Sequence, residues 1–243
     1  MTGSFVSAGT RERVRGMAAP IATALGRLGL TPNALTLIGF VGTCIAALAA
    51  ANQGWLAAGA LVLAFGIFDL FDGTLARAMG RASKLGAFLD STFDRAGEAI
   101  VYIGIAMGAI YGGSQLAAIL AGSAMAAAFM VSYTRAKAES LGFSSGTGIA
   151  GVGLAPREVR IVILAVGLVA TGLAAFFLPQ AAELCTLEGL SDTDRENVFS
   201  CLLRAQQLSG EAVLNATLGL ITILATVTVL QRILHVRSQA KEG

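Results

Sequence analysis

Long apolar segments are the feature that most constrains the fold of this chain. Six stretches are apolar over about the length that a helix needs to cross the hydrocarbon core of a bilayer, roughly 20 residues. They cover residues 33–51, 55–76, 85–112, 115–138, 158–178 and 212–234. The breaks between them fall at polar or glycine-bearing stretches such as ANQG and YGGS. The sequence therefore predicts an all-α integral membrane protein with six transmembrane helices, which form a single membrane domain over residues 1–243.

The composition favours the same class of protein. Hydrophobic residues make up 55% of the chain and charged residues only 13%, whereas a soluble domain carries about 25% charged residues. The N-terminus has arginines but no apolar run followed by a small-residue cleavage site, so we expect the first helix to stay in the mature protein. Membrane lipids are the expected surroundings, and no nucleic-acid polymer is expected as a partner.

The segment before the first span has its own pattern. Residues 10–30 alternate basic and apolar side chains, and the apolar ones recur at spacings of three and four: Met17, Ile21, Leu25 and Leu28. This pattern predicts an interfacial amphipathic helix, with a disordered basic tail as the alternative. Thr31 is the expected N-cap of the first span, and Pro32 its first helical residue.

Basic residues in the short loops predict the orientation in the membrane. Both termini and the loops at 77–84 and 135–160 share one side, which carries most of the lysines and arginines. The predicted extracytoplasmic loop at 179–211 is mainly acidic. The sequence therefore places both termini and the polar helix ends on the cytoplasmic side of a plasma or inner membrane.

The chain has three cysteines. Cys44 lies within the first span and is most simply a small buried apolar residue. Cys185 and Cys201 both fall in the predicted outer loop, where a disulfide between them and two free thiols are both open interpretations. The role of this loop is not indicated by its sequence.

Four aspartates stand out in this apolar chain. Asp69 and Asp72 are three residues apart, and Asp90 and Asp94 are four apart, so each pair shares one face of a helix. A short connection makes the second and third spans antiparallel neighbours, which brings the four carboxylates together. Such a cluster needs protonation or bound cations. Oxygen ligands without a nearby histidine or cysteine suit Mg²⁺, Mn²⁺ or Ca²⁺, and a metal of this kind favours a phosphate-bearing ligand.

Small residues flank the aspartates: Gly73, Ala76 and Gly86. Glycine inside a helix costs roughly 1 kcal/mol relative to alanine, and here its use would be to admit a ligand close to the backbone. Helix packing is the alternative for these residues, and it is our interpretation of Gly104 and Gly108.

The whole stretch resembles the signature of the CDP-alcohol phosphotransferase family. All eight fixed positions match, at the spacing of that signature: Asp69, Asp72, Gly73, Ala76, Arg77, Gly86, Asp90 and Asp94. The resemblance implies an enzyme that moves a phosphatidyl-type group from a CDP-linked lipid, such as CDP-diacylglycerol, to an alcohol and releases CMP. It also implies a homodimer.

The resemblance implies roles for individual residues. A pair of Mg²⁺ or Mn²⁺ ions would be bound by Asp69, Asp72, Asp90 and Asp94, and Asp94 would also be the general base. The CDP-linked lipid would be bound by Asp69, Gly73, Ala76, Arg77, Pro32 and Asn33. These roles agree with two-metal displacement at phosphorus, in which a carboxylate takes the hydroxyl proton.

Basic residues further along the chain bear on the acceptor alcohol. Arg157 and Arg160 lie three apart on one helical face, and with Arg135 they would suit a phosphate dianion. The stretches SYTRAKAE and PREVR resemble the inositol-phosphate branch of the family, which implies acceptor contacts from Ser132, Arg135, Lys137, Arg157 and Arg160. Positive-inside anchoring is the alternative for these cations, and glycerol 3-phosphate is the alternative acceptor.

Two other classes of protein also accommodate intramembrane carboxylates. A cation or proton transporter is one, because such residues commonly mark ion paths. A lipid-binding scaffold with protonated carboxylates is the other. The aspartates cluster at one membrane face, which favours the enzyme.

Overall fold

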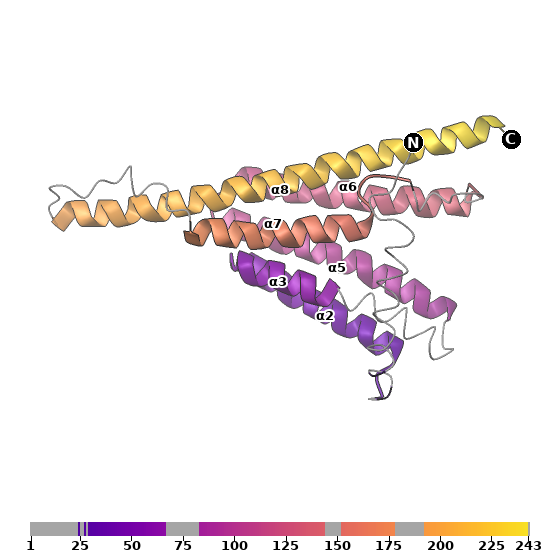
Figure 1. Ribbon diagram of the computed structural model, residues 1–243, viewed down its shortest axis with the longest axis horizontal. Coiled ribbons are helices and arrows are strands. Elements are labelled where there is room, and N and C mark those ends of the chain that lie inside the picture. The colour runs from indigo at the N-terminus through magenta and orange to yellow at the C-terminus, as the bar shows by residue number, and fades with distance from the viewer. Residues whose placement is uncertain are drawn as a thin grey trace.

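The computed structural model describes residues 24, 27, 29–66, 83–143, 152–177 and 192–242, and within 192–209 only the backbone. Helices dominate these residues, and Figure 1 shows them as an elongated bundle. Their bounds are α2 (Pro32–Ala51), α3 (Trp55–Gly66), α5 (Lys84–Tyr111), α6 (Gln115–Ser140), α7 (Arg157–Phe177) and α8 (Asp192–Glu242).

Each of the six predicted spans corresponds to one of these helices, which confirms the six-helix, all-α prediction. Four are long and apolar enough to cross a membrane: α2, α6, α7 and the Gly210–Lys241 part of α8. Helix α3 is apolar over its 12 described residues, and the rest of the predicted span 55–76 lies outside the described residues. Helix α5 has 28 residues and carries its charged residues within its first 15.

The region before the last span differs from the prediction. Helix α8 begins at Asp192 and continues for 51 residues, so the predicted loop at 179–211 is wrong for its second half, which is helical. The physical reason lies in the local sequence. No proline or glycine interrupts residues 192–209, and acidic residues in the first turn suit the positive end of a helix dipole.

Two other predictions fall largely or wholly outside the described residues. Of the predicted interfacial helix at 10–30, only Ala24, Arg27 and the last two residues are described, and Ala24 and Arg27 are helical. Cys185 and the side chain of Cys201 are also outside, so their disulfide stays a prediction.

Polar caps define where the helices start. The Thr31 hydroxyl accepts a hydrogen bond from the Ala34 N–H at 3.2 Å, and Pro32 follows as the first helical residue, as predicted. Ser83 caps α5 in the same way through the Gly86 N–H at 3.0 Å. These caps satisfy amide groups that have no partner within the helix.

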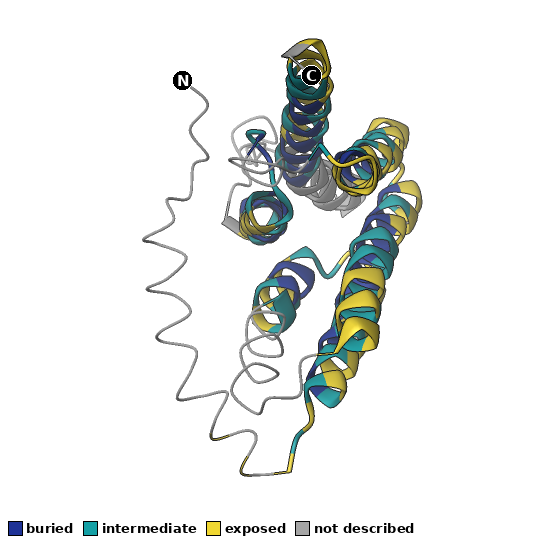
Figure 2. Ribbon diagram, turned by 90° about the vertical axis from the view of Figure 1, so that its right-hand side faces the viewer, coloured by how far each residue is buried: buried dark blue, intermediate teal, exposed yellow. Residues whose placement is uncertain are grey.

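Small residues let the helices approach closely. A Cβ atom on Gly104 or Gly108 of α5 would collide with the carbonyl oxygens of Ala47 or Ala50 on α2. The packing role predicted for these two glycines is therefore confirmed. Many large apolar side chains are exposed instead, and Phe176 for example is 74% exposed. Figure 2 shows exposed positions along the helices in yellow. Such a surface is suited to lipid, where small residues rather than large apolar ones mediate helix contacts.

One end of the bundle gathers the polar features. The starts of α2, α5 and α7 and the ends of α6 and α8 all lie towards the same end, on the right of Figure 1. Residues far apart in sequence meet there, and they form the candidate site.

Candidate functional site

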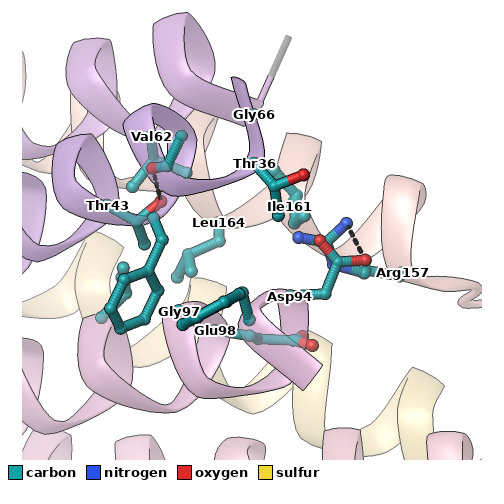
Figure 3. Close-up of a pocket in the computed structure, with 14 residues that line it drawn as sticks. Thr36, Thr43, Val62, Gly66, Asp94, Gly97, Glu98, Arg157, Ile161 and Leu164 are labelled. Atoms are coloured by element: carbon teal, nitrogen blue, oxygen red, sulfur yellow. Dashed lines mark hydrogen bonds and ion pairs between the residues drawn. The ribbon is translucent and has the colours of Figure 1, made fainter. Parts of the chain in front are cut away.

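Asp94 and Arg157 form the centre of the site. Asp94 lies in the third turn of α5, and Arg157 is the first residue of α7. The Arg157 Nη1 atom is 2.8 Å from Asp94 Oδ2, and the two side chains are only 21% and 15% exposed. Figure 3 shows this contact among the residues that line a pocket bounded by α2, α3, α5 and α7. The structure thus joins the predicted general base to a residue predicted to bind the acceptor.

Polar and apolar side chains line the pocket together. Its charged lining residues are Asp94, Glu98 and Arg157, whereas Val62 and Leu164 are among the apolar ones. The pocket can therefore hold a charged group beside apolar side chains.

The described half of the predicted metal site fits a divalent cation. Asp90 and Asp94 stand one helical turn apart on α5, and both are partly exposed rather than sealed in the bundle. Carboxylate oxygens are the ligands that Mg²⁺ and Mn²⁺ prefer. Asp69 and Asp72 lie outside the described residues, as do Gly73, Ala76 and Arg77.

A second ion pair lies one turn deeper between the same two helices. Arg160 donates from Nε and Nη2 to the two carboxylate oxygens of Glu98, both at 2.9 Å. The side chains are 1% and 7% exposed, so the pair is buried. Arg160 also donates from Nη1 to the Ala155 carbonyl at 3.0 Å. The guanidinium predicted to face the acceptor is thus engaged with protein groups on all three of its nitrogen atoms.

The structure does not bring the five predicted acceptor residues into one cavity. Ser132 and Arg135 line an open cavity of about 470 Å³ between α5 and α6. Lys137 lines a different hollow, between α6 and α8, which it shares with Arg232. Arg157 is at the Asp94 pocket, and Arg160 is buried on Glu98. Arg135 is also paired with Glu139 at 2.9 Å, on the exposed face of α6.

The two residues predicted at the start of α2 lie beside α5. Pro32 is the first residue of α2, and Asn33 follows it. A Cβ atom on Gly86 would be 3.6 Å from Asn33 Oδ1, so the start of α2 adjoins the start of α5. Asn33 therefore lies next to Gly86, which is one of the glycines of the family signature.

Three residues near the site were missed by the sequence analysis. Arg95 places Nη1 3.7 Å from Asp94 Oδ2 and lines the cavity that holds Ser132 and Arg135. Arg232 and Thr228 of α8 are buried beneath the segment that leads into α7. For Arg95, its position directly after Asp94 was an available signal. For Arg232, a charged residue near the end of an apolar span was a signal of the same kind.

The comparisons with known proteins point to one family. The profile of CDP-alcohol phosphatidyltransferase matches residues 29–187. The archaetidylinositol phosphate synthase of Pyrococcus horikoshii is 41% identical over 155 residues, which are 63% of this chain and 77% of the relative. The phosphatidylinositol phosphate synthase of Cutibacterium acnes is 43% identical over 157 residues, which are 64% of this chain and 73% of the relative.

Solved structures agree on the fold. The crystal structure of Mycobacterium tuberculosis phosphatidylinositol phosphate synthase with CDP-DAG bound matches with a TM-score of 0.67 and 25% identity, over 90% of this chain and 92% of that one. The same enzyme in complex with manganese and citrate matches with a TM-score of 0.66 and 24% identity, over 90% and 88% of the two chains.

Proposed function

Because the chain belongs to the CDP-alcohol phosphatidyltransferase family, we propose that it transfers a phosphatidyl-type group from a CDP-linked lipid to inositol phosphate. Family membership makes the chain a transferase and sets aside the transporter and the inert scaffold. The two relatives named above are inositol phosphate lipid synthases, and this supports inositol phosphate as the acceptor. The observation that carries the proposal is the 2.8 Å contact between Asp94 and Arg157.

In the proposed reaction, an acceptor hydroxyl oxygen attacks the lipid-bearing phosphorus of the CDP-linked lipid. The new P–O bond replaces the bond to CMP, which leaves, and the hydroxyl proton passes to Asp94. A general base must be within hydrogen-bond reach of that proton. Asp94 meets this need for access, since it lines the pocket and its side chain is 15% exposed.

Arg157 would bind the phosphate of the acceptor. Its planar guanidinium suits the oxygens of a phosphate. Because it already contacts Asp94, a phosphate held by Arg157 would keep the rest of the acceptor close to the base. Positioning of this kind accelerates a reaction by removing the entropy cost of bringing the groups together. Ser132, Arg135 and Lys137 stay predicted acceptor residues on the neighbouring helix α6.

Two divalent cations, Mg²⁺ or Mn²⁺, would be held by Asp69, Asp72, Asp90 and Asp94, and when bound they supply positive charge for the attacking and leaving oxygens. The manganese complex of the Mycobacterium tuberculosis enzyme supports this assignment. The CDP-linked lipid would contact Gly73, Ala76 and Arg77, together with Pro32 and Asn33 at the start of α2.

The site would face the cytoplasm. The end of the bundle that holds Asp94 also carries Arg135, Lys137, Arg157 and the C-terminal arginines, and positive residues favour the cytoplasmic side. A homodimer is part of the proposal, and the mass of the detergent-solubilised protein by light scattering tests it.

An acceptor panel tests the proposed reaction. Purified protein in detergent receives CDP-diacylglycerol, Mn²⁺ or Mg²⁺, and one of four acceptors: inositol 1-phosphate, free inositol, glycerol 3-phosphate or serine. We expect CMP release with inositol 1-phosphate. Release with glycerol 3-phosphate alone would instead support phosphatidylglycerophosphate synthesis. No CMP with any acceptor would overturn the enzyme assignment of this chain.

A further inference from the structure

The segment Val152–Pro156, which leads into α7, is held by side chains of two helices, α7 and α8. We call it the α7 lead-in. Ala155 is fully buried, and both of its backbone polar groups are bonded to side chains. Its N–H donates to Thr228 Oγ1 of α8 at 2.9 Å, and its carbonyl accepts from Arg160 Nη1 at 3.0 Å. Arg157 starts α7 two residues later.

Arg160 is itself fixed by Glu98. Two parallel hydrogen bonds of 2.9 Å join the guanidinium to the carboxylate across the gap between α7 and α5. A bidentate pair sets orientation as well as distance. Glu98 therefore acts on the α7 lead-in through Arg160, and it also lines the pocket that holds Asp94 and Arg157.

Helix α8 supplies the other side of the attachment. Thr228 is fully buried, and its hydroxyl donates to the Leu224 carbonyl at 2.8 Å while accepting from Ala155. Arg232, 3% exposed, donates to the Val152 carbonyl at 3.1 Å and also to the Val131 carbonyl of α6. Gly153 lies against Thr228 and has a φ of +125°, a backbone conformation in which a residue with a side chain would be strained. The lead-in is thus seated on α8 with little room to shift.

We infer that Glu98 and Thr228 are positioning residues for the acceptor, which act through Arg160 and Ala155 to hold Arg157 against Asp94. The inference rests on the proposed function, since it assumes that Arg157 binds the acceptor phosphate. A buried ion pair gives little net stability, because the loss of solvation offsets the attraction. Its geometric value is greater here, since a displacement of about 1 Å can cost roughly 100-fold in rate.

A purely structural role makes a different prediction. If these contacts only stabilise the bundle, their loss should lower thermal stability and affect both substrates alike. If they position Arg157, their loss should raise the acceptor KM while leaving the affinity for the CDP-linked lipid unchanged. The two readings therefore separate in kinetics rather than in stability.

The decisive comparison uses two variants of one residue. Thr228→Val keeps the shape but removes the hydroxyl that holds Ala155, whereas Thr228→Ser keeps the hydroxyl. We expect Thr228→Val to raise the KM for inositol 1-phosphate about tenfold, within the range that misplacement of a binding group produces, and Thr228→Ser to retain the wild-type KM. Amide hydrogen exchange at residues 152–155 should speed up in Thr228→Val and not in Thr228→Ser.

Glu98→Gln repeats the test from the α5 side. It keeps the volume of the side chain and removes the charge, and we expect the same selective rise in acceptor KM. Glu211→Gln is the matched control. Glu211 accepts a hydrogen bond of 2.5 Å from Ser114, where α6 and the membrane span of α8 begin, at the end of the bundle away from the site. This variant should lose stability without a change in either substrate's KM.

The outcomes for the two proposals are distinct. Wild-type turnover on the acceptor panel tests the proposed function, and the comparison is made with whichever acceptor gives CMP. An acceptor KM in Thr228→Val and Glu98→Gln no higher than in Glu211→Gln would overturn only the positioning role. Equal losses for both substrates would also overturn it. Wild-type protein that releases no CMP with any acceptor would overturn the proposed function and this inference together.

Discussion

Replacement of Arg160 by methionine tests how much the buried pair with Glu98 contributes to the fold. The Arg160 side chain is 1% exposed and the Glu98 side chain is 7% exposed, so water cannot solvate either charge when its partner is removed. Removing one member of such a pair typically costs about 3–5 kcal/mol, because the other charge stays buried without compensation. We expect losses of that size in the free energy of unfolding for Arg160→Met and for Glu98→Met separately.

The double variant separates the cost of leaving one charge buried without its partner from the other losses. Glu98→Met with Arg160→Met leaves no buried charge, and methionine fills most of both volumes. What is still lost is the bond from Arg160 to the Ala155 carbonyl, and an unsatisfied buried group costs about 1–3 kcal/mol. The double variant should therefore be more stable than either single variant, which gives a coupling of at least about 3 kcal/mol, at or above the upper end of the range that contacting residues usually show.

Unfolding in mixed micelles by titration with sodium dodecyl sulfate gives the free energies. Arg135→Met is the matched control, since Arg135 and Glu139 form an exposed pair on one helix, at 48% and 42% exposure. Its loss should be about 0.3–0.5 kcal/mol. The reasoning fails if Arg160→Met costs no more than this control. It also fails if the double variant loses the sum of the two single losses.

Three further predictions concern the reaction and the packing. Asp94→Asn should abolish CMP release while CDP-lipid binding persists, measured by equilibrium binding of labelled lipid; loss of metal-dependent binding would make Asp94 chiefly a metal ligand. Arg157→Ala should raise the acceptor KM with CDP-lipid affinity unchanged, and an unaltered KM would remove Arg157 from the acceptor site. Gly104→Leu should lower the free energy of unfolding by more than the roughly 1–3 kcal/mol of ordinary overpacking, because a Cβ atom there would collide with the Ala47 carbonyl. Gly122→Leu is the control: the space around Gly122 is open, so the same detergent titration should give the wild-type free energy of unfolding.

Much of the architecture was predictable because it depends on local sequence. Apolar length defined the spans, and α2, α5, α6 and α7 begin within one residue of their predicted starts. Thr31 and Pro32 marked the start of α2 through capping chemistry that involves only neighbouring residues. The insert before the last span was mistaken for a loop because its polarity outweighed its helix-forming residues, although α8 runs through its second half.

The candidate site was likewise predictable only where it depends on local spacing. Spacing alone placed Asp90 and Asp94 on one face of a helix, and Arg157 and Arg160 on one face of another, since both follow from the helical period. The partners of those arginines depend on the rotation and height at which the fold places α7 relative to α5. Only the tertiary structure decided that Arg157 meets the partly exposed Asp94 and that Arg160, one turn further along α7, is buried on Glu98.

The sequence by itself determined a six-span membrane bundle, the family signature and the helix faces that carry charge, because periodicity, capping and motif spacing act over a few residues. The tertiary structure decided which charges meet. Arg135 and Lys137 are two residues apart yet line different hollows, because successive helical positions point in different directions. Glu98 and Arg160 are 62 residues apart yet form two hydrogen bonds, because the fold places α5 and α7 on two sides of one pocket, where the long arginine side chain reaches across to the carboxylate.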